Sequence, residues 1–169
     1  MEDKGSIRVG QPFMDRQQLL GEIYAGLYSF LKGKACAVFA APFDVFFLGR
    51  SKVDQDIFSV LQPDICVVCD ETRLDDHGFM AAPDIIVEIL SAEHNRGDLE
   101  NRLVIYEAYG VREYWIVHPD EQYFLKYIRG DDGIFGTGKL YDGGVEFVSD
   151  ILPGFRLNVE EVFGLLKFA

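Results

Sequence analysis

The chain has 169 residues and a formal net charge of −12, a size that suits one domain. The acidic balance argues against a general nucleic-acid-binding surface, because such surfaces need clustered Lys and Arg. It does not exclude a nuclease whose charges are arranged around metal ions. No apolar run approaches the roughly 20 residues of a membrane span. Three cysteines and the lack of a signal peptide predict a cytoplasmic protein without disulfides.

The first predicted element is a helix. Residues 1–13 are polar and contain glycine, so we expect a flexible N-terminal segment. Apolar residues then recur at helical spacing from Met14 to about Lys32, and Gly33 is the predicted end of the helix.

Two strands are predicted next. Residues 36–48 and 57–69 are rich in β-branched and aromatic residues, and each run is interrupted by a proline, at Pro42 and Pro63. Residues 70–80 are polar and predict a loop.

The second half of the chain begins with its clearest strand, the β-branched run at 83–90. A helix from Asp98 to Gly110 and a short apolar strand at 113–118 follow. The remaining predictions are strands at 122–129 and 145–148 and a helix from the capping pair Asn158 and Glu161 through Leu166. The order indicates a mixed α/β (α+β) fold without the regular strand–helix alternation of a doubly wound sheet.

Four carboxylates fall inside these apolar strands. Facing residues of an antiparallel pair have numbers with a constant sum, so counting around the loop between the second and third strands places Asp64 opposite Glu88. Counting around the preceding turn places Asp44 opposite Asp64. Asp84 shares the face of Glu88 because side chains alternate along a strand. We therefore expect the four acids to converge on one side of a sheet.

Carboxylates buried in strands need a positive partner, because an unpaired buried charge is costly. One candidate is a divalent cation such as Mg²⁺, which takes oxygen ligands and can prepare a water for attack on a phosphodiester. The alternative is a structural salt-bridge network, in which Asp64 or Glu88 pairs with Arg96, Arg102 or Arg112.

Three segments carry a resemblance to a known family: Gln-Pro-Asp-Ile-Cys-Val-Val at 62–68, Ala-Pro-Asp-Ile-Ile-Val-Glu-Ile-Leu-Ser at 82–91, and Tyr-Glu-Ala-Tyr-Gly-Val-Arg-Glu-Tyr-Trp-Ile-Val-His-Pro at 106–119. They resemble the Uma-type family of restriction endonucleases, within the PD-(D/E)XK nuclease-like superfamily. The resemblance extends from about Asp15 to the Leu-Pro-Gly-Phe at 152–155. It implies a single domain over 14–169, with a restriction-endonuclease-like mixed β-sheet flanked by helices.

The resemblance also implies roles for particular residues. Asp64 and Glu88 match the superfamily's acidic residues and become the expected ligands of Mg²⁺ or Mn²⁺. Leu90 stands where the usual catalytic lysine would be, and Arg102 matches the helix position that supplies the lysine in this family. Arginine stays protonated, so it can supply charge and hydrogen bonds but cannot act as a base.

For other residues of the candidate site, the sequence leaves more than one role open. Asp15 and Arg16 stand where the family often has a Glu-His pair at the start of the first helix. Glu22 is either a third acidic ligand or a solvated helix residue. Asp84 is an expected auxiliary acid, and Asp44 is either an auxiliary acid or a surface charge on an edge strand.

The remaining polar and aromatic candidates have structural explanations. Cys66 and Cys69 would point to opposite faces of a strand, so we expect core packing rather than zinc or redox chemistry. The histidines, His77, His94 and His118, are expected to lie at the surface or to form hydrogen bonds. Tyr106 is expected to pack between helix and sheet.

The expected function is that of a divalent-metal-dependent endonuclease that hydrolyses phosphodiester bonds in nucleic acid, with DNA as the expected substrate. Asp64, Glu88 and Arg102 would form its catalytic site. A homodimer is expected because related nucleases often pair to cut two strands. The alternative is a catalytically degenerate nuclease-like module for binding or assembly, which the acidic surface and the arginine at 102 both favour.

Overall fold

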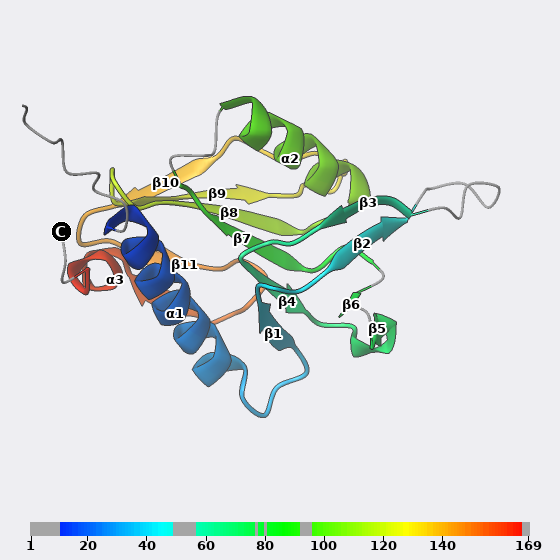
Figure 1. The fold of residues 1–169 in the computed structure, drawn as a ribbon, viewed down its shortest axis with the longest axis horizontal. Helices are drawn as coiled ribbons and strands as arrows, with labels where there is room; N and C mark the ends of the chain where they lie inside the picture. The colour runs from blue at the N-terminus through cyan, green and yellow to red at the C-terminus, as the bar shows by residue number, and fades with distance from the viewer. Residues whose placement is uncertain (1–10, 49–56, 77, 80, 92–95, 167–169) are drawn as a thin grey trace, which may run out of the picture.

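A six-stranded sheet forms the centre of the molecule (Figure 1), and its strands lie in the order β1-β4-β7-β8-β9-β10. The computed structural model describes residues 11–48, 57–76, 78–79, 81–91 and 96–166. β7 and β8 are parallel, and the other neighbouring strands are antiparallel. The strands of this sheet are β1 (Ala37–Ala40), β4 (Ile65–Val68), β7 (Ile85–Ile89), β8 (Glu113–His118), β9 (Tyr123–Ile128) and β10 (Lys139–Asp142).

Helices and smaller sheets cover both faces of the central sheet (Figure 1). The helices are α1 (Gln11–Leu31), α2 (Arg96–Tyr109) and α3 (Val159–Gly164), with a 3-10 turn η1 at Glu71–Arg73. One small sheet contains β2 (Val45–Leu48), β3 (Ile57–Leu61), β5 (Leu74–Asp75) and β6 (Gly78–Phe79), and another contains β11 (Glu146–Val148) and β12 (Arg156–Asn158). None of the helices in the described part of the chain is long and apolar enough to cross a membrane.

Two hydrophobic cores lie on opposite faces of the sheet, because the side chains of β7 alternate between them. Ile85, Val87 and Ile89 belong to the core that α1 and α3 cover. Ile86 belongs to the core that contains Tyr106 of α2. Because β7 is buried along its whole length, any charged side chain on this strand must find its partner inside the protein.

The expected mixed fold with a sheet flanked by helices is confirmed. Gly33 and Gly110 follow the first two helices with φ of 77° and 95°, which is the left-handed conformation that glycine adopts readily. The cap of the last helix is also confirmed, since the Glu161 amide donates to the Asn158 side chain at 3.0 Å. The predicted flexible segment, 1–13, falls mostly outside the described residues, and α1 is already helical at Gln11.

Several short strands differ from the sequence prediction. The polar stretch at 70–80, expected to be a loop, contains η1, β5 and β6. β10 and β12 were not predicted. They are four and three residues long and lack a run of β-branched residues, so their pattern alone does not distinguish them from turns.

The interruptions at Pro42 and Pro63 divide the predicted strands between different sheets. The halves before and after each proline become β1 and β2, and β3 and β4. β1 pairs with β4, whereas β2 pairs with β3, so β2 does not face β4. The predicted pairing of Asp44 with Asp64 is therefore wrong. The register that pairs Val45 with Leu61 brings Asp44 to Gln62, whose side-chain amide donates to it at 2.7 Å.

The expectation of no disulfide is also wrong. Cys36 and Cys69 form a disulfide, because the register that pairs Ala37 with Val68 continues to these two residues. Cys66 is free and buried in the core, as expected. The expectation of core packing is wrong for Cys69, because this residue forms the disulfide. The bond fastens the start of β1 to the end of β4.

Candidate functional site

The site lies where β4 begins and β7 ends. β4 and β7 are antiparallel neighbours, with Ile65 opposite Val87. The next step of this register places Asp64 opposite Glu88, as the sequence predicted. Both acids are almost completely buried, at 3% and 2% exposure, although they are charged residues in apolar surroundings. Each must therefore be compensated locally.

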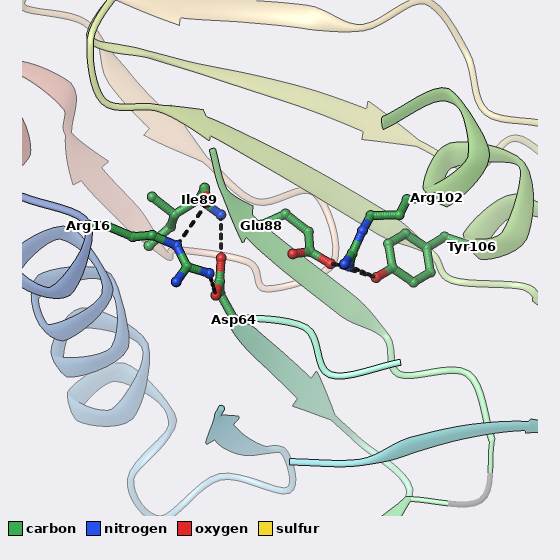
Figure 2. A network of polar contacts seen from close by, with 6 residues as sticks. All are labelled: Arg16, Asp64, Glu88, Ile89, Arg102 and Tyr106. Carbon is green, nitrogen blue, oxygen red and sulfur yellow. Dashed lines mark hydrogen bonds and ion pairs between the residues drawn. The ribbon is translucent and has the colours of Figure 1, made fainter. Parts of the chain in front are cut away.

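Asp64 is held from both sides by protein donors (Figure 2). One carboxylate oxygen pairs with the guanidinium of Arg16, which extends from α1. The other oxygen accepts the backbone N–H of Ile89 at 2.7 Å. Arg16 also donates from Nε to the Ile89 carbonyl at 3.2 Å. One arginine therefore connects α1 with β7 and with the residue that directly precedes β4.

Glu88 has its own arginine, which comes from the other face of the sheet (Figure 2). Its Oε1 accepts a bond from Arg102 Nη1 and a second bond, of 2.6 Å, from the Tyr106 hydroxyl. Arg102 Nη1 lies 3.2 Å from the same hydroxyl. Arg102 and Tyr106 are four residues apart on α2, so they project from the same side of that helix.

Burial dominates the electrostatics of this cluster. It raises the pKa of Glu88 to about 7, against the opposing effects of Arg102 and the Tyr106 hydrogen bond, and the nearby charge of Asp64 raises that pKa further. For Arg102, burial is the largest effect and acts to lower the pKa, but the attraction of Glu88 together with the contacts to Tyr106 and Tyr114 raises the pKa overall. Burial and Glu88 together raise the pKa of Tyr106, which therefore remains a hydrogen-bond donor at neutral pH.

The structure does not bring together all four predicted carboxylates. Asp84 precedes β7 and has different partners: it accepts the Cys69 amide at 2.8 Å and pairs with Arg112 at 3.0 Å. Asp44 bonds to Gln62 in a different sheet. Glu22 is exposed on α1. Of the ion pairs in the salt-bridge alternative, the structure shows Arg102 with Glu88, whereas Arg112 pairs with Asp84 and not with Asp64 or Glu88. The cluster centres on Asp64 and Glu88.

Two residues of this cluster were not predicted from the sequence. In the sequence, Arg16 was noted only because it departs from the family's Glu-His pair. Its positive charge near the start of the first helix was the one feature that could have predicted a partner for a buried acid. Tyr106 was expected to pack in the core, and it is fully buried. The signal for its hydroxyl contact was its spacing of four residues from Arg102.

Asp64 and Glu88 suit a hard divalent cation, because Mg²⁺ is commonly held by one or two carboxylates together with water and phosphate oxygens. They are neighbours that interact electrostatically in this structure. Within the described ranges, no group of three or more His, Cys, Asp or Glu side chains is placed to hold an ion. A cation held by these two carboxylates would therefore take its remaining ligands from water or substrate, and it would replace donors that Asp64 and Glu88 now accept from.

The chain, with its mixed sheet flanked by helices and its two buried acids, matches a known family. The chain belongs to the Uma2 family, described as putative restriction endonucleases, whose model matches residues 7–160.

The fold is also similar to a solved structure. This is the crystal structure of a putative nuclease belonging to DUF820 from Anabaena variabilis ATCC 29413. The TM-score is 0.71 at 19% sequence identity, and the match covers 90% of this chain and 82% of that one. No curated protein matches the chain. At this identity the similarity establishes the fold, and the chemistry must be argued from the residues.

Proposed function

We propose that this protein is a divalent-metal-dependent endonuclease that hydrolyses phosphodiester bonds in nucleic acid, with DNA as the substrate. The observation that carries the proposal is the pair Asp64 and Glu88, two buried acids facing each other on adjacent strands. Burying two acids side by side is unfavourable for folding alone, and a strongly raised carboxyl pKa such as that of Glu88 is concentrated at functional sites. Membership of the Uma2 family supports the same conclusion.

In this proposal, Asp64 and Glu88 hold Mg²⁺ or Mn²⁺, which would polarise the phosphodiester and make a bound water more acidic. Arg102 contributes fixed positive charge for the phosphate, since its side chain keeps 25% exposure while its guanidinium is anchored by Glu88. Tyr106 orients both Glu88 and Arg102 through its hydroxyl. Arg102 cannot accept a proton from water, so its role is electrostatic.

Incubation of the purified protein with plasmid DNA and Mn²⁺ or Mg²⁺ tests this function. We expect cleavage that EDTA stops, and a loss of about 100-fold or more in Asp64→Asn and Glu88→Gln, because each variant removes one charged oxygen ligand. Asp142→Asn, which changes an exposed acid on β10, is the matched control and should cleave normally. Cleavage that survives both site substitutions would contradict the assignment.

The second candidate is a nuclease-like binding or assembly module without catalysis. One observation favours it: each acid already has an arginine partner, so the cluster is electrically balanced by the protein itself. Arg102→Lys separates the two candidates, because lysine is the residue expected at this position. Metal-dependent cleavage that increases in Arg102→Lys would indicate a weakened enzyme. No cleavage in either form would favour the module.

The assembly state and location belong to the same proposal. A homodimer would place two sites against the two strands of a duplex, and sedimentation with and without DNA measures this directly. We also propose a cytoplasmic location, because a nuclease of this class would meet DNA there. In that reducing environment the Cys36–Cys69 disulfide would form only transiently.

A further inference from the structure

Arg16 occupies an unusual position in the site, because it is bonded to groups from two strands at once. Its Nη2 pairs with Asp64 and its Nε donates to the Ile89 carbonyl. Asp64 itself closes the same ring of contacts by accepting the Ile89 amide. The guanidinium therefore has a defined place beside the carboxylate rather than a loose surface contact.

The exposure of the two partners differs. The side chain of Asp64 is 4% exposed, whereas that of Arg16 is 26% exposed. Asp64 is fixed in the sheet, but Arg16 extends from α1 with part of its surface in water. Arg16 is thus the partner that can leave this pair without unfolding the strands.

Charge determines what Arg16 would do to a cation. When both acids are ionised, they carry two negative charges, and Arg16 and Arg102 balance both of them. A divalent cation added to this cluster would meet two guanidinium groups, and like charges at short range in a partly buried site repel strongly. Arg102 is bonded to Glu88 and Tyr106 on α2's side of the site, and Arg16 is bonded to Asp64 and the Ile89 carbonyl. A cation that takes Asp64 as a ligand therefore meets Arg16 first.

We propose that Arg16 is the built-in counter-ion of Asp64, and that a divalent cation binds to this site by displacing it. α1 therefore sets the metal affinity of the site. This inference depends on the proposed function, because it takes Asp64 to be a metal ligand.

Calorimetric titration with Mn²⁺ in the absence of nucleic acid tests the inference. Arg16→Gln should bind Mn²⁺ about tenfold or more tightly than the wild type, a change comparable with the effect of one nearby charge on a carboxyl. Arg16→Lys keeps the charge and should remain close to the wild type. Arg156→Gln, which removes an exposed arginine paired with Glu146, is the matched control for net charge and should change the affinity less than twofold.

The double variant Arg16→Gln/Asp64→Asn identifies the ligand and should lose the tight binding. Unchanged or weaker binding in Arg16→Gln, together with wild-type binding that depends on Asp64, would overturn the inference and leave the metal site intact. No Asp64-dependent binding in any protein would overturn the metal site itself and leave Arg16 as a structural partner.

A second measurement uses the wild-type protein, so its result does not depend on whether a substituted protein folds. In protein labelled with ¹⁵N-arginine, the Arg16 Nε–H signal should shift and exchange faster with water as Mg²⁺ saturates the site, because its bond to the Ile89 carbonyl is lost. The Arg156 signal serves as the internal reference. An Arg16 signal that stays unchanged at saturation would overturn the displacement.

Discussion

Glu88 is the residue whose environment departs most from that of a normal surface acid. It is 2% exposed, and burial is the largest of the effects that raise its pKa to about 7. Between the ordinary carboxyl pKa of 4.5 and this value, the folded protein binds a proton at Glu88 that the unfolded chain does not. Stability due to Glu88 is therefore present at low pH and is lost as the pH rises through this window.

The substitution Glu88→Gln tests this sign. Urea unfolding of the wild type and the variant between pH 4.5 and 8 should show the wild type losing stability relative to the variant as the pH rises to about 7. The relative change should be on the order of 2 kcal/mol and should level off above that pH. Glu146→Gln, an exposed acid on β11, controls for the loss of one carboxyl. A difference that is independent of pH, or that has the opposite slope, would show that Glu88 is not the titrating group.

At the scale of elements, the disulfide joins Cys36, just before β1, to Cys69, just after β4, and the two cysteines are 33 positions apart in the sequence. β1 lies at an edge of the sheet and pairs with β4 alone among the strands described for that sheet. A covalent link at this edge restricts the unfolded chain and keeps β1 in register. The bond therefore stabilises β1, which is the neighbour of β4 in the sheet. Asp64 lies directly before β4.

Reduction of this disulfide should lower the free energy of unfolding by about 3–4 kcal/mol, the value expected for closing a loop of this length. Thermal unfolding with and without dithiothreitol measures the loss, and Cys36→Ser/Cys69→Ser should reproduce it. Cys66→Ser in the reduced protein is the control for replacing a thiol. If dithiothreitol lowers the stability of the double serine variant as much as that of the wild type, the effect does not come from this bond.

Elements with a strong local pattern could be predicted from the sequence. The β-branched run of β7 and the glycine that ends α2 are local signals, and counting around a loop gave the register between Asp64 and Glu88. Arg16 could not be predicted as the partner of Asp64, because that contact depends on how α1 packs across the sheet. The disulfide was missed for a related reason, since it required knowing that β1, separated from β2 at Pro42, pairs with β4.

At the scale of the whole molecule, a second buried ionic network attaches the C-terminal segments to the central sheet. Lys126 of β9 is 2% exposed and donates to the Val148 carbonyl at 2.7 Å, and it also pairs with Asp150. Glu113 of β8 lies 3.6 Å from the same amine and accepts the Ser149 hydroxyl at 2.6 Å. The network thus joins β8, β9 and the chain that follows β11.

Lys126→Met should destabilise the fold by about 3–5 kcal/mol, because it leaves Glu113 buried without a cation. Urea unfolding measures the cost. Lys139→Met, at an exposed position of β10, is the control for losing a lysine. The double variant with Glu113→Gln should recover part of the stability. If the loss of unfolding free energy in the double variant equals the sum of the losses in the two single variants, the two residues are not coupled.

The pairing of Asp64 with Arg16 also bears on how such sequences evolve. Loss of Asp64 would leave Arg16 and the Ile89 amide without their acceptor, so selection for a stable chain acts on Asp64 separately from selection for the proposed DNA cleavage. A lineage that loses its activity would therefore still retain this aspartate.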